Sequence, residues 1–69
     1  MTVQIIVTDR AGTKTDLGYQ TMQVWTSVLG AMAQKETFAI SLSQGTSDFE
    51  WHHHVWAPGD IVHAEMLER

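Results

Sequence analysis

The apolar residues of this chain change their spacing twice, and this change constrains the fold more than any other feature of the sequence. Residues 2–8 alternate polar and apolar side chains, with Val3, Ile5 and Val7 on one face, as in a strand with one buried face. Residues 22–32 instead space their apolar side chains by three and four, which predicts a helix. After the helix the period returns to two. The sequence therefore predicts strands at both ends of the chain and one helix between them.

The predicted helix carries its apolar side chains on one face, at Met22, Trp25, Val28, Leu29 and Met32. Gly30 lies inside the helix, where glycine costs about 1 kcal/mol relative to alanine, so we expect it to have a packing role. Small and polar side chains extend from it as a smooth strip, formed by Ser27, Gly30, Ala31 and Gln34. We expect this strip to lie over the domain's own sheet, with a second helix or sheet as the alternative.

Turn-forming residues divide the rest of the chain. Gly12 favours a turn after the first strand, and Pro58-Gly59 favours a turn before the last one. A polar loop at residues 44–48 has the length of a hairpin connection. We expect strands at residues 2–8, 13–17, 38–43, 49–56 and 61–67.

This ββαβββ order predicts an α+β fold of two layers, an antiparallel sheet with one helix packed on one face. We expect the sheet to end in a three-stranded meander, and residues 1–69 to form one domain. A domain of this length buries only about 60% of the surface that its unfolded chain exposes. The chain has no Cys, so no disulfide stabilises it. Because one helix cannot cover five strands, we expect a homodimer that buries the remaining apolar surface.

Composition excludes several classes of partner. The net charge is −4 and the four basic residues are scattered, which argues against a nucleic-acid surface. No apolar run approaches the roughly 20 residues of a membrane span, and the N-terminus has no basic segment followed by an apolar one. We therefore expect a cytoplasmic protein that binds neither nucleic acid nor a membrane.

The segment from Glu50 to Trp56 contains three consecutive histidines inside a predicted strand. Strand geometry divides the segment into two faces. The face that we expect to pack on the core carries Phe49, Trp51, His53 and Val55. The face that we expect to be exposed carries Glu50, His52, His54 and Trp56.

Two histidines on one strand face suggest a metal site. The Cα atoms of His52 and His54 are expected to lie about 6–7 Å apart, so both rings reach one divalent ion. If the last strand pairs alongside, His63 supplies a third ligand and Glu50 or Glu65 a carboxylate, a set that suits zinc or iron. The alternative is that the histidines are solvated or lie in a subunit interface, where their protonation weakens assembly below about pH 6.

No motif for nucleophilic catalysis or phosphate binding occurs in the sequence, which favours a binding protein over an enzyme and implies no cofactor. We expect a homo-oligomeric module that binds a partner protein, comparable in size with accessory factors and with inhibitors from phages or mobile elements. Its predicted binding residues are Trp51, Trp56, His52, His54 and Arg10, which can pair a phosphate beside a Trp ring. The alternatives are a metal-binding protein or metal-dependent enzyme at the histidines, and a small-ligand protein with its pocket between subunits.

Overall fold

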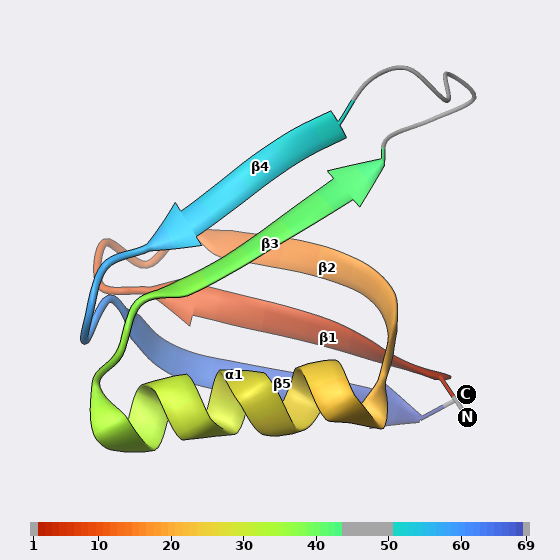
Figure 1. Cartoon of the computed structure of the whole chain (residues 1–69), viewed down its shortest axis with the longest axis horizontal. Coiled ribbons are helices and arrows are strands. Elements are labelled where there is room, and N and C mark those ends of the chain that lie inside the picture. Colours follow the sequence, from red (N-terminus) through yellow and green to blue (C-terminus); the bar gives the residue numbers. More distant parts are fainter. Residues whose placement is uncertain (1, 44–50, 69) are drawn as a thin grey trace.

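The computed structural model describes residues 2–43 and 51–68 and has the element order β1-β2-α1-β3-β4-β5 (Figure 1). The elements are β1 (Thr2–Asp9), β2 (Lys14–Thr21), α1 (Met22–Gln34), β3 (Phe38–Ser43), β4 (Trp51–Trp56) and β5 (Ile61–Glu68). One helix packed with antiparallel strands in this order is the predicted α+β fold. No helix in these two ranges is long and apolar enough to cross a membrane.

β1 is the middle strand of a three-stranded antiparallel sheet in the order β2-β1-β5. Its residues Val3, Ile5 and Val7 are fully buried, which confirms the face predicted from the alternation. Because β1 is paired on both sides, its backbone polar groups are satisfied within the sheet. The core forms on this one face of the sheet, where α1 and the bases of β3 and β4 pack on it (Figure 1).

β2 is longer than predicted because it contains a bulge. Gln4 pairs with Tyr19 and Ile6 with Asp16, so Leu17 and Gly18 together lie opposite a single residue of β1. Gly18 has a φ of 72°, a conformation that suits glycine at a bulge. The bulge lets the strand continue to Thr21, four residues beyond its predicted end.

Both predicted turns are present. At the first, the Asp9 side chain accepts a hydrogen bond from the Thr13 N–H at 2.9 Å, as expected for Asp in a turn. At the second, the Asp60 N–H donates to the Ala57 carbonyl at 3.0 Å. These local contacts explain why turn residues could be recognised in the sequence.

α1 buries the predicted face only in part. Val28 and Ala31 are buried, and Val24, Trp25 and Met32 pack partly against the core. Met22 and Leu29, both predicted on the buried face, are exposed. The stripe is rotated because α1 packs against both β2 and β5, which sets its orientation by tertiary contact. The helix ends at Lys35, whose backbone is left-handed with φ of 53° and whose N–H donates to the Ala31 carbonyl.

β3 and β4 form a separate two-stranded antiparallel sheet, which projects from the rest of the molecule (Figure 1). The predicted meander is therefore wrong, because β5 does not continue from β4 in one sheet but pairs with β1. The physical reason is that β1 has a wholly apolar face and hydrogen-bonding groups on both of its edges. β2 pairs with one edge, and the turn at residues 57–60 brings β5 to the other. The predicted loop at 44–48, with Phe49 and Glu50, lies outside the described residues.

The two faces of β4 are also the reverse of the prediction. Trp56 is 8% exposed and belongs to the core, whereas Trp51 and Val55, predicted to face the core, are 57% and 67% exposed. Phe38 lies opposite Trp56 in the strand register, and their rings are 5.8 Å apart. This aromatic pair at the base of the hairpin decides which face turns inward, because it lies where β3 and β4 meet the main sheet.

Candidate functional site

The outer face of the β3–β4 hairpin is an exposed surface that carries two large apolar side chains, Trp51 and Val55. We call it the outer hairpin face; it consists of Ala39 and Ser41 on β3 and of Trp51, His53 and Val55 on β4. The register sets Ala39 opposite Val55 and Ser41 opposite His53, so these side chains form one continuous surface. Such an exposed aromatic and aliphatic surface is typical of a protein interaction site.

A polar contact fixes the middle of this surface. The Ser41 hydroxyl and His53 Nδ1 lie 2.6 Å apart across the two strands and share a hydrogen bond. His53 was predicted to be half-buried, but it is exposed. The contact orients the His53 ring on the outer hairpin face, and it leaves Nε2 of that ring to a partner or to solvent.

The inner face of the hairpin carries the other predicted binding residues of β4. His54 is half-buried and stacks on Trp56, with ring centroids 5.9 Å apart and planes at 18°. His54 Nε2 is buried and has no hydrogen-bond partner within residues 2–43 and 51–68. His52, nearer the free end of the hairpin, is exposed. Trp51 and Trp56, both predicted binding residues, thus lie on opposite faces, and the buried one is Trp56.

The predicted metal ligands are not brought together. His63 lies on β5, which pairs with β1 and not with the histidine strand β4, and its Nε2 is 3.2 Å from Glu65 Oε1. Across the two described ranges no group of three or more His, Asp or Glu side chains lies close enough to hold a metal ion. Glu50, the predicted carboxylate ligand, lies outside those ranges. The effect of histidine protonation on assembly stays a prediction.

Arg10 and Trp56 do lie near each other, as the phosphate hypothesis requires. They border a hollow of about 470 Å³ together with Asp9 and Asp60. However, the Arg10 guanidinium donates to the Gly59 carbonyl at 3.1 Å and so links the two turns. The two carboxylates oppose an anion in this hollow, and Trp56 is too buried to offer a ring face for stacking. The geometry gives no support to a phosphate ligand.

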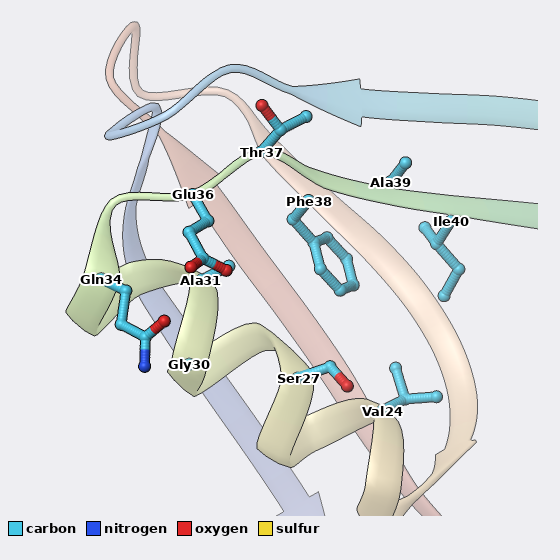
Figure 2. Close-up of a pocket in the computed structure, with 10 residues that line it drawn as sticks. All are labelled: Val24, Ser27, Gly30, Ala31, Gln34, Glu36, Thr37, Phe38, Ala39 and Ile40. Carbon is cyan, nitrogen blue, oxygen red and sulfur yellow. The ribbon is translucent and has the colours of Figure 1, made fainter.

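A second hollow, of about 520 Å³, lies between α1 and β3 (Figure 2). We call it the helix–strand groove. Its helix wall includes the whole predicted strip of small and polar residues, namely Ser27, Gly30, Ala31 and Gln34. Figure 2 shows Phe38 and Ile40 pointing from β3 toward the helix. A Cβ atom on Gly30 would have nothing within 4 Å, so Gly30 faces open space at this groove. The strip was expected to lie over the domain's own sheet, but of its residues only Ala31 is buried in the core.

No family model, no curated protein sequence and no solved structure matches this chain.

Sequence reasoning missed the outer hairpin face because it assigned Trp51 and Val55 to the core. The sequence did offer one signal, which is the alternation of apolar side chains along β3 and β4 when the two strands are compared with each other. Ala39 and Ser41 are the weakly apolar positions of β3, and residues opposite them in register share their face. The face of β4 that carries Val55 is thus the partner of the less apolar face of β3.

Proposed function

We propose that this protein is a homo-oligomeric, protein-binding module and that the outer hairpin face is the surface that binds the partner protein. The observation that carries the proposal is the exposure of Trp51 and Val55, at 57% and 67%, on one face of a two-stranded sheet. Tryptophan is enriched among residues that dominate binding energy, because its large ring buries much apolar area at little entropic cost.

The surroundings of Trp51 support the same function. Ala39 and Val55 add apolar area beside it, while Ser41 and His53 supply a hydrogen-bonding pair on the same surface. Protein interfaces commonly combine an apolar centre with a few polar groups that orient the partner. The side chains of this surface include no Lys, Arg, Asp or Glu within the described residues, so a partner need not neutralise or desolvate a full charge.

The experiment is capture of the partner by matched variants of the chain. Trp51→Ala and Val55→Thr remove apolar area from the outer hairpin face, and Leu29→Ala removes a similar exposed side chain from α1 as the control. We expect the native chain and the control to retain the same partner and Trp51→Ala to lose it. With the purified partner, Trp51→Ala should raise the dissociation constant by about 30-fold or more, equivalent to about 2 kcal/mol.

Two results would count against the proposal. One is equal partner affinity for the native chain and for Trp51→Ala. The other is loss of the partner in the Leu29→Ala control alone, which would move the site to α1. Circular dichroism of each variant checks that the fold is retained.

A further inference from the structure

The helix–strand groove runs along the edge of β3 that faces away from β4. Residues 36–40 border it, and the last three of them, Phe38, Ala39 and Ile40, are consecutive residues of β3. A strand directs alternate side chains to opposite faces, so a hollow over one face would contact only every second residue. Contact with consecutive residues, and with none of β4 in the described structure, places the groove at the strand's edge.

This edge has none of the features that protect edge strands. Within the described ranges β3 pairs with β4 alone, so the N–H and C=O groups on its other side are open to a further strand. Natural edge strands are commonly blocked by a charged residue, a proline or a bulge. β3 has the sequence FAISLS, without a charge or a proline, and its register with β4 runs without a shift. The edge is therefore competent to pair.

The helix wall leaves room for a strand. Ser27, Gly30 and Ala31 are the small residues of that wall, and the space beyond Gly30 is empty. A volume of about 520 Å³ lies within the range of protein binding pockets. Gly30 also weakens the helix, so its presence is explained if a larger side chain would obstruct an occupant.

We infer that the occupant is β3 of a second copy of this chain, which lies antiparallel along β3 about a two-fold axis. The inference rests on the homo-oligomeric part of the proposed function. The pairing joins the two hairpins into a four-stranded sheet, which is more stable than a hairpin, since an isolated two-stranded sheet is marginal in water. This pairing is compatible with two-fold symmetry, because the two β3 strands make the same set of contacts with each other.

Charge does not oppose a second copy of the chain as the occupant. β3 carries no charged residue, so pairing with its own copy places no like charges opposite each other. Glu36 is the only residue of the groove lining that is charged at neutral pH, and it lies before β3. Antiparallel pairing therefore sets the two Glu36 carboxylates at opposite ends of the joined strands, where they do not repel.

The same pairing buries more of the inner face of the hairpin. Ile40 and Leu42 are only half-buried in one chain, although they lie on the side that faces the core. A two-fold axis perpendicular to the sheet keeps the inner faces of both copies on one side. The inner side chains of the second copy then lie over the helix wall at Ser27 and Gly30.

The experiment fills the groove from the helix side. Gly30→Phe puts a ring into the empty space, whereas Gly30→Ala is the matched control that adds only a Cβ with no contact. Both changes favour the helix, so neither should unfold α1. In sedimentation equilibrium we expect the native chain and Gly30→Ala to dimerise, and Gly30→Phe to raise the dimer dissociation constant by about ten- to a hundredfold.

Hydrogen exchange of the β3 amides assigns the contact. In the native dimer we expect the β3 amides that point away from β4 to exchange slowly. In Gly30→Phe we expect the same amides to exchange fast. A monomer at every concentration overturns the inference and leaves the groove to another protein's strand. A dimer that Gly30→Phe does not weaken also overturns it. If Trp51→Ala then dissociates that dimer, self-association uses the outer hairpin face, so the homo-oligomeric part of the proposed function survives without this inference.

Discussion

Lys35 is the one non-glycine residue among those described that has a positive φ, and it ends α1. A side chain in the left-handed region costs about 1–2 kcal/mol, which glycine avoids at the price of a more flexible unfolded chain. We therefore expect Lys35→Gly to stabilise the fold by about 0.5–1 kcal/mol, measured by urea unfolding. Lys35→Ala keeps the strained conformation and serves as the control. A gain of equal size in both variants would show that the loss of the lysine, and not the backbone, is responsible.

His54 presents the opposite case, a polar atom that its surroundings do not satisfy. Its Nε2 is buried without a hydrogen-bond partner in the described structure, and its ring stacks on Trp56. A buried polar group that makes no hydrogen bond is destabilising by about 1–3 kcal/mol. We expect His54→Phe, which keeps a stacked ring without the nitrogens, to raise the free energy of unfolding by about 1 kcal/mol.

The neighbouring His52 provides the control for this measurement. It lies on the same strand but is exposed, so His52→Phe should change stability by less than about 0.5 kcal/mol. A loss of stability in His54→Phe would contradict the expectation that the unpaired Nε2 is destabilising.

At the scale of elements, the hairpin has one structural and one exposed tryptophan. Trp56 packs against Phe38 and anchors β4 to the core, whereas Trp51 contacts solvent. We expect Trp56→Leu to lower the free energy of unfolding by about 2 kcal/mol and Trp51→Leu to change it by less than about 0.5 kcal/mol. Thermal and urea unfolding of the two variants measure the difference. Equal destabilisation would contradict the assignment of the two faces.

The sequence predicts elements better than it predicts their pairing, and the reason is visible at β4 and β5. The turns at Asp9–Gly12 and Ala57–Asp60 and the buried face of β1 depend on neighbours in the chain, so local patterns were sufficient. The partner of β5 depends on β1, more than fifty residues away in sequence. Alternation carries no information about such a distant edge, and it predicted the meander wrongly.

The candidate site was predictable only in part for a related reason. Both faces of β4 carry one tryptophan, so the apolar content of the strand did not distinguish the core face from the exposed one. The contact of Trp56 with Phe38 decides it, and that contact requires the register between two strands. Trp51 was predicted to be a binding residue, although on the face that was assigned to the core, and its role in binding stays a prediction.

At the scale of the whole molecule, the core is small for the number of elements. Among residues 2–43 and 51–68, nine apolar residues are buried, while large apolar side chains such as Tyr19, Leu29 and Val62 are exposed on three different elements. A single domain of this length buries a limited share of its surface, and natural small domains commonly gain stability from a further cross-link or from assembly. The chain has no Cys, so no disulfide supplies that cross-link, and the proposed assembly would add the missing stability.

Coupling between assembly and folding makes thermal stability depend on protein concentration. If the native state is a dimer and the unfolded chain a monomer, a concentration increase of about a hundredfold stabilises each dimer by about 2.7 kcal/mol. Shared between two chains of this length, that gain raises the Tm by about 5–10 °C. Differential scanning calorimetry at the two concentrations measures the shift. Gly30→Ala should show it and Gly30→Phe should not, because only the larger side chain fills the helix–strand groove. A Tm that is the same at both concentrations for the native chain would show that the folded monomer is stable by itself.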